Sequence, residues 1–238
     1  MCTTRIFGLI IALVILAGCS QIPITGSGNV VTQEVPITGF DKVDISYSFD
    51  VKLSQGESFS VVIRADDNLV EHLQVVKQGS TLKIGLKPNS PDIRSATLQA
   101  EITMPELTGL DLSGSSQVTI TGFKSAQALV VDASGASHLQ GDIEADTVSF
   151  NLGGSSEVIL TGSAQNLIME EAAGSSDVDL TDFAVVDASI KAGGKSQVTV
   201  NVSGRLDAEA SSASHVYYLG SPTLGKMDTS GSSSIEQK

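Results

Sequence analysis

The sequence predicts an all-β fold, a parallel β-helix with about 20 residues in each coil. Apolar residues alternate with polar ones on both sides of a Gly/Ser-rich bend that occurs seven times. Aromatic residues make up 4% of the 238 residues, and Trp is absent. The last serine of each bend falls at positions 116, 137, 156, 176, 196, 214 and 233. Steps of 18 to 21 residues leave room for about three short strands and three bends per coil, whereas a propeller blade needs about 40 residues.

Residues 1–18 are typical of a signal peptide, with Arg5 followed by an apolar run over 6–16 that is too short to span a bilayer. The run ends in Leu-Ala-Gly-Cys, which resembles the bacterial lipobox. This resemblance implies that Cys19 is acylated and becomes the new N-terminus, and more than one acyl chain anchors a protein stably. Ser20 then implies the outer membrane if the source has one. The alternative is an ordinary secretory signal that ends in a chance cysteine.

The mature chain is expected to begin with a polar tether over residues 19–29, which leads into a β-helix domain over 30–238. Residues 30–105 are expected to form less regular coils, with alternating apolar residues over 43–53. Residues 73–76 and 82–86 flank a Gln-Gly-Ser turn and predict a hairpin. Residues 66–73 could form one short helical turn.

Residues 106–238 are expected to form the regular coils, in which stacking turns sequence positions into columns. The Gly/Ser bends suit a sharp corner because Gly adopts its backbone angles without strain. Glu170 does not fit, because simple register places it in an inward column with Phe150 and Ile190. A buried unpaired carboxylate is costly, so we expect the strand to bulge and Ile168 and Met169 to repack. The alternative is a functional buried acid.

The opening Phe-Asp-Lys-Val-Asp-Ile over 40–45, the Asp-Asp-Asn-Leu over 66–69 and the recurring Gly-Ser-Ser bends resemble the head GIN domain family. The resemblance covers about residues 35–238. It implies a right-handed, single-stranded parallel β-helix and an adhesin-like function, because members of the family are called putative autotransporter adhesins.

The charge of −13 and the pI near 4.5 argue against a nucleic-acid partner, which needs a basic surface. They also argue against electrostatic docking onto anionic lipid. After removal of the leader, Cys2 is lost and Cys19 has no disulfide partner.

Glu157 and Asp177 are expected about 5 Å apart on adjacent coils, with Asp179 on the same face. Two carboxylates at that spacing occur in retaining glycosidases, and calcium takes similar oxygen ligands. Stacked acidic side chains are also unavoidable on the surface of an acidic β-helix. His138 and His215 share a column but lie four coils apart, too far to chelate one metal ion. We therefore expect no catalytic residue, no cofactor and no metal, and treat Glu157, Asp177 and Asp179 as a candidate ladder for a ligand or cation.

These observations favour a non-enzymatic, lipid-anchored protein of the cell envelope that binds an unknown polysaccharide or protein. One alternative is an enzyme acting on polysaccharide, which rests on analogy with other β-helices. The other is a structural envelope protein that forms homo-oligomers through exposed coil edges.

Overall fold

The computed structural model describes residues 23–125 and 127–238, and these residues fold mainly into β-strands. The strands before the regular coils are β1 (Ile24–Thr25), β2 (Val30–Glu34), β3 (Lys42–Ile45), β4 (Asp50–Gln55), β5 (Ser60–Asp66), β6 (Leu73–Gln78), β7 (Thr81–Leu86), β8 (Ile93–Arg94) and β9 (Leu98–Met104). A 3₁₀ helix, η1 (Asp67–His72), lies between β5 and β6, where a helical turn was expected.

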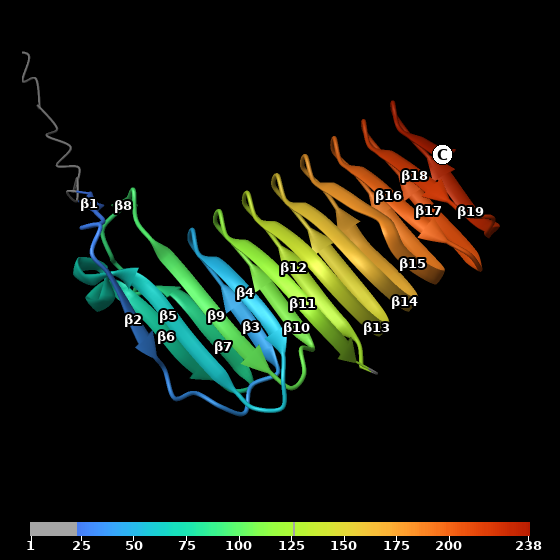
Figure 1. Cartoon of the computed structure of the whole chain (residues 1–238). Coiled ribbons are helices and arrows are strands. Elements are labelled where there is room, and N and C mark those ends of the chain that lie inside the picture. The colour runs from blue at the N-terminus through green and yellow to red at the C-terminus, as the bar shows by residue number, and fades with distance from the viewer. Residues whose placement is uncertain (1–22, 126) are drawn as a thin grey trace, which may run out of the picture.

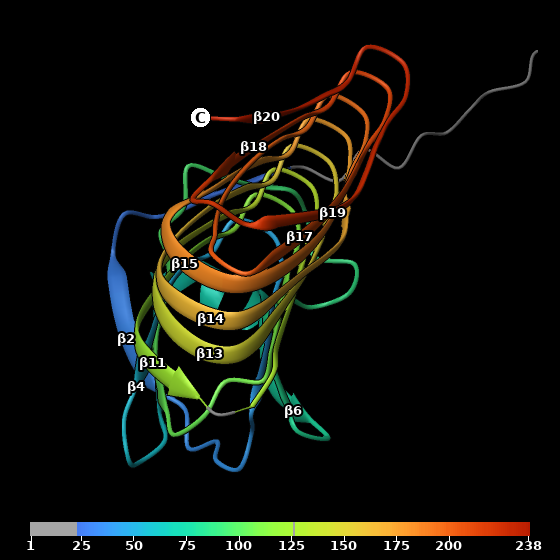
Figure 2. The ribbon, with the colours of Figure 1, turned by 90° about the vertical axis from the view of Figure 1, so that its right-hand side faces the viewer.

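The regular part continues through β10 (Gly109–Leu112), β11 (Gln117–Ser125), β12 (Leu129–Ala133), β13 (His138–Leu152), β14 (Glu157–Ala172), β15 (Asp177–Ala192), β16 (Gln197–Val202), β17 (Arg205–Ala210), β18 (His215–Leu219), β19 (Thr223–Thr229) and β20 (Ser234–Gln237). These strands pair in parallel with the strands about 20 residues before and after them, which confirms the solenoid (Figure 1). Viewed from the C-terminal end, the chain turns anticlockwise as it advances toward the viewer, so the helix is right-handed (Figure 2).

The cross-section of the middle coils, which β13, β14 and β15 form, has one sharp corner, not three. The Gly/Ser bends form that corner, and on the opposite side the coil is rounded (Figure 2). In the middle coils, β13, β14 and β15 each run unbroken for 15 or 16 residues from one bend to the next. The expectation of three short strands per coil was therefore wrong, because the backbone curves gradually without losing its inter-coil hydrogen bonds.

The N-terminal part is stacked out of sequence order. The coil made by β3 and β4 lies between the strands β7 and β9 on one side and β10 and β11 on the other. Beyond β9 the strands become antiparallel, because β5 pairs with β9 and β2 pairs with β5. The expected hairpin is present as β6 paired with β7. One sheet face thus continues from the solenoid into an antiparallel end (Figure 1).

The interior is filled by the inward residues of each coil. The second residue after the last serine of each bend is aliphatic, and those from Val118 to Val216 are almost fully buried. The phenylalanines Phe49, Phe123, Phe150 and Phe183 are the largest of the fully buried side chains. The core therefore runs along the whole axis as a continuous stack, in which each coil covers the apolar face of its neighbour.

The bends hold the stack together through backbone hydrogen bonds and buried serines. At the corner of β13 and β14, Gly154 has φ +73°, which residues with a Cβ rarely adopt. The hydroxyl of Ser156 donates to the carbonyl of Gly153 at 2.7 Å and is buried. The same buried serine recurs at 116, 137, 176, 196 and 214. The recurring Gly-Ser pattern is thus explained by the shape of the corner.

The second half of the expected tether belongs to the folded domain. Ile24 and Thr25 form β1, which pairs with β8. Asp66 is 1% exposed and accepts hydrogen bonds from the backbone of Gly28 and Thr97, both at 2.7 Å. Ser27 donates to Asp67 at 2.6 Å, which holds the pKa of that carboxyl below its usual value. The Asp-Asp-Asn segment at 66–68 therefore clamps residues 25–29 onto the domain, and only residues 19–22 of the expected tether lie outside the described part.

Glu170 is the extra residue of a β-bulge. In the pairing of β13 with β14, Phe150 faces Met169 and Asn151 faces Glu171, so Glu170 has no pairing partner on β13. Its side chain is 64% exposed, whereas Met169 is buried in the inward column. The expected bulge is confirmed, and a buried functional acid at this position is excluded.

Candidate functional site

The carboxylates that the sequence singled out lie together on one face. Glu157 begins β14 and pairs with Asp177, which begins β15, while Asp179 follows two residues later and points the same way. The row continues as predicted, and runs through Gln117, His138, Glu157, Asp177, Gln197, His215 and Ser234. Glu157 is already engaged, because its carboxylate is 2.9 Å from Nδ1 of His138. We call Glu157 and Asp177, together with Asp179 two residues further along β15, the acidic row.

A second row runs beside the first, two residues further along each strand. Its members over the same coils are Ile159, Asp179, Thr199 and Tyr217. A pocket of about 150 Å³ lies between the two rows and is bounded by Lys238. The Lys238 ammonium lies 3.3 Å from the Thr199 hydroxyl and 4.4 Å from the centre of the Tyr217 ring. The pocket therefore combines carboxylates, an apolar side chain, a hydroxyl and an ammonium group.

Two of the acids have shifted pKa values, in opposite directions. The pKa of Asp177 is raised, mainly because neighbouring protein atoms shield it from water, and also because Glu157 and Asp179 are negatively charged. The pKa of Asp179 is lowered, mainly because Thr181 donates hydrogen bonds to its carboxylate. Lys238 lowers the pKa of both. Asp177 is thus the acid with the least compensation for its charge.

The acids and the histidines of this face are spread along one row. Among the residues that the structure describes, no group of three or more His, Cys, Asp or Glu side chains is placed to hold a metal ion. His138 and His215 occupy the same row with Glu157, Asp177 and Gln197 between them. The acids lie side by side on an open sheet face, so they present negative charge outward.

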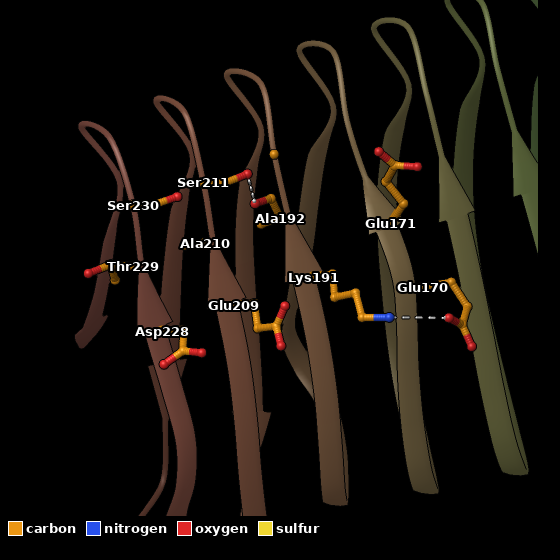
Figure 3. Close-up of a pocket in the computed structure, with 11 residues that line it drawn as sticks. Glu170, Glu171, Lys191, Ala192, Glu209, Ala210, Ser211, Asp228, Thr229 and Ser230 are labelled. Atoms are coloured by element: carbon orange, nitrogen blue, oxygen red, sulfur yellow. Dashed lines mark hydrogen bonds and ion pairs between the residues drawn. The ribbon is translucent and has the colours of Figure 1, made fainter.

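A larger groove on the opposite face was not predicted as a site. It has a volume of about 670 Å³ and spans the ends of β14, β15, β17 and β19 (Figure 3). Its charged lining residues are Glu170, Glu171, Lys191, Glu209 and Asp228. The Lys191 ammonium reaches across to Glu170 at 3.8 Å, as the dashed line in Figure 3 marks. Asp111, Asp132, Asn151 and Glu171 stand in one outward column of the stack, and Lys191, Glu209 and Asp228 occupy the corresponding positions of β15, β17 and β19. The bulge expected at Glu170 brings that side chain into the groove.

The same column widens into another groove near the N-terminal end. This groove has a volume of about 320 Å³ and is lined by Asp44, Asp111, Asp132 and Lys83, among others. Lys83 pairs with Asp44 at 2.9 Å. The pKa of Asp111 is raised, mainly by shielding from water and then by the negative charges of Asp44 and Asp132. Both faces of the solenoid are therefore acidic, but on this one lysines pair with the acids.

Cys19 and the expected signal peptide over 1–18 lie outside the described residues. Within the described part of the chain, no helix is long and apolar enough to cross a membrane.

Comparison with known proteins places the chain in a well-defined structural context. A model of the family described as putative auto-transporter adhesin, head GIN domain, matches residues 39–222. Among curated proteins, none matches the chain.

Several solved bacterial structures share the fold. A putative adhesin from Bacteroides fragilis has a TM-score of 0.83 at 20% identity, covering 90% of this chain and 100% of that one. A putative lipid binding protein from Parabacteroides distasonis has a TM-score of 0.70 at 23% identity, covering 91% and 100%. A putative adhesin from Parabacteroides merdae has a TM-score of 0.67 at 17% identity, covering 91% and 99%. At these identities the likeness establishes the fold.

Proposed function

The chain belongs to the family described as putative auto-transporter adhesin, head GIN domain, and from this premise we propose that it is a non-enzymatic, adhesin-like binding module of the bacterial cell envelope. The observation that carries the proposal is the pair of polar rows that run side by side across successive coils. A solenoid presents such repeated outward positions as one extended surface, which suits binding of a large partner. The partner would be a polysaccharide or a protein.

The arrangement of the acids supports binding over hydrolysis. A glycosidase holds its acid and its second carboxylate on either side of the scissile bond, usually in a cleft. Glu157 and Asp177 instead occupy neighbouring positions in one row, and Glu157 is paired with His138. The pocket of about 150 Å³ beside them is also small compared with the roughly 300–1,000 Å³ of typical ligand sites.

Attachment to the membrane through Cys19 is the second part of the proposal. It is supported by the lipobox-like Leu-Ala-Gly-Cys after an apolar run. It also agrees with the clamp at residues 66–68, which fixes the start of the folded domain a few residues after Cys19. We place the protein in the outer membrane if the source has one. The structural neighbour from Parabacteroides distasonis is described as a putative lipid binding protein, which is compatible with a role at a lipid surface.

Self-association is a further part of the proposal. Among the described residues, β19 pairs with β17 and β20 pairs with β18, and no strand covers their outer edges. Leu224 on β19 is 49% exposed. Exposed strand edges of this kind pair readily with another chain. Sedimentation velocity of the wild type and of Leu224→Lys tests this, since a dimer formed through this edge should dissociate in the variant.

Binding is tested on an array of envelope glycans and matrix proteins, with the protein lacking residues 1–19. Saturable binding that weakens in Glu157→Ala with Asp177→Ala is the expected result. A matched variant on the other face, Glu171→Ala with Asp228→Ala, should bind as the wild type does. Shortening of a bound glycan would refute the non-enzymatic part. No binding to any array component would refute a binding role for the acidic row.

Anchoring is tested with the full chain expressed in a Gram-negative host. The wild type should fractionate with membranes and incorporate a labelled fatty acid, and Cys19→Ser should do neither. Labelling of the Cys19→Ser protein, or release of the wild type into the soluble fraction, would contradict the proposal.

A further inference from the structure

The pocket beside the acidic row has the dimensions and walls of a site for a single long side chain. Its volume is about 150 Å³, and it opens between the rungs that begin with Glu157, Asp177 and Gln197. Ile159 lies in its lining and is 39% exposed, which makes it one of the few large apolar side chains exposed among the described residues. A ligand there would contact an apolar surface and carboxylates at the same time.

Two of the three acids of the pocket have no ion-pair partner among the described residues. Among the described residues, Asp177 and Asp179 take part in no ion pair, whereas Glu157 is paired with His138. Asp177 is destabilised in its charged form by shielding from water and by its two acidic neighbours. A cation that entered from outside would therefore relieve a repulsion that is already present.

Lys238 shows how an ammonium group is accommodated at this place. Its Nζ donates to Thr199 at 3.3 Å and lies above the Tyr217 ring at 4.4 Å. The ring of Tyr217 is itself stacked on His215, with centroids 6.3 Å apart. Contact of an ammonium with an aromatic face and a hydroxyl is a favourable arrangement, and the positive charge acts on both Asp177 and Asp179.

We propose that this pocket binds a Lys or Arg side chain of a basic protein partner, and that Lys238 occupies the mouth of the pocket when the partner is absent. The charged end of the incoming side chain would sit between Glu157, Asp177 and Asp179, with its methylene stem against Ile159. This deepens the proposed binding function and rests on it. Lys238 thereby acts as an internal competitor that the partner displaces.

Charge complementarity and shape favour a basic protein over a cationic glycan. Residues 106–238 carry 6 Lys and Arg against 17 Asp and Glu, so the regular coils attract basic partners over a distance. Ile159 offers a contact for a methylene chain. An amino sugar would need an aromatic platform, but the residues that line the pocket are Glu157, Val158, Ile159, Asp177, Asp179, Gln197, Thr199 and Lys238, none of them aromatic.

The test uses a tetralysine peptide as the probe, titrated into the ¹⁵N-labelled protein at low salt, where surface attraction is strongest. The amide signals of Thr199 and Ile159 should shift on binding. In Asp177→Asn with Asp179→Asn, the affinity should fall by about tenfold. In Lys238→Ala, it should rise about threefold or more, because the competitor is gone.

The matched control is Glu171→Gln with Asp228→Asn, which removes the same charge from the groove on the other face. Its affinity should stay within about twofold of the wild type. Equal losses in the two double variants would overturn the proposal, since attraction would then be general. Tighter binding of a glucosamine tetramer than of tetralysine would overturn the proposal in favour of a glycan partner. An unchanged affinity for tetralysine in Lys238→Ala would overturn the role of Lys238 as a competitor.

The tetralysine titration and the array of glycans and matrix proteins can fail independently of each other. Binding of array components without tetralysine binding refutes this inference and leaves the adhesin-like function standing. Thermal denaturation of each variant shows that a loss is not due to unfolding.

Discussion

Replacing Gly154 by Ala separates the role of the bend from that of glycine in general. The residue has φ +73°, and a Cβ there would overlap the carbonyl oxygen of Gly135 and lie 2.9 Å from its nitrogen. Because Ser155 donates to that same oxygen at 2.7 Å, the clash cannot be relieved without opening the rung. The left-handed conformation costs a residue with a Cβ about 1–2 kcal/mol. Weakening one inter-coil hydrogen bond adds about 1 kcal/mol, so the free energy of unfolding should fall by about 2–4 kcal/mol.

The neighbouring Gly153 is the control, because it lies in the same bend with a different environment. Its φ is not positive, and no atom lies within 4 Å of a Cβ built there. Gly153→Ala should leave stability unchanged or raise it by about 0.4–1 kcal/mol, since the unfolded chain loses freedom. With a urea m-value of about 3 kcal/mol per molar, the midpoint should fall by about 1 M in Gly154→Ala alone. Equal midpoints in the two variants would refute the steric account of the bends.

Three further outcomes are expected. Ser156→Ala should lower the free energy of unfolding by about 1–2 kcal/mol, because it removes the hydrogen bond from the buried Ser156 hydroxyl to the Gly153 carbonyl. The exposed Ser155→Ala should change the free energy of unfolding by less than about 0.5 kcal/mol, and urea midpoints measure both effects. Asp66→Ala leaves the backbone amides of Gly28 and Thr97 without their acceptor. Amide hydrogen exchange over residues 25–29 should therefore become faster before exchange in the coils does, and Asp66→Asn should have a smaller effect. Because the folded state raises the pKa of Asp177, the charged carboxylate opposes folding above the raised pKa, and the effect disappears below the usual pKa of an aspartate. Asp177→Asn should therefore have a higher Tm than the wild type at pH 7 and the same Tm at pH 3. A Tm difference at pH 3 but not at pH 7 would contradict the assigned cause.

The regular coils could be predicted because the pattern of apolar residues and glycines determines their register. A period of two fixes which residues point inward, and a glycine corner fixes where each coil ends. The columns through Val158 and through Glu157 therefore followed directly. Even the bulge at Glu170 was foreseeable, because a carboxylate in an apolar column is too costly to bury.

The N-terminal part could not be predicted in the same way. Local signals gave the β6–β7 hairpin and the turn of η1, since both depend on neighbouring residues. Sequence order suggests that consecutive coils stack, yet the coil of β3 and β4 is inserted between two later segments. No local pattern encodes that choice of neighbour. The clamp at Asp66 was also missed, because a polar run over residues 19–29 reads as a tether until its partner is known.

The sequence predicted the row of acids but not the pocket beside it, because the pocket also needs Lys238 from a distant part of the chain. Glu157 and Asp177 share a column and were bound to be neighbours, with Asp179 beside them, but the pocket depends on Lys238, which returns across Thr199 and Tyr217. Such a contact spans 39 residues and two coils, and nothing in the repeat requires it. The period of the repeat thus predicts the rows and not what crosses them.

The contrast between the bends and the outward faces indicates which residues are free to carry function. The bends and inward columns carry the requirements of the fold, so their residues are fixed to Gly, Ser and aliphatic types. Outward positions between the bends face no such requirement, because the backbone alone supplies the hydrogen bonds from coil to coil. On the face of the acidic row, an exposed Ile159 beside three carboxylates is not needed for folding. An apolar side chain held in water next to charges that repel each other is disfavoured in the free protein, and a basic partner with a methylene stem would relieve both at once.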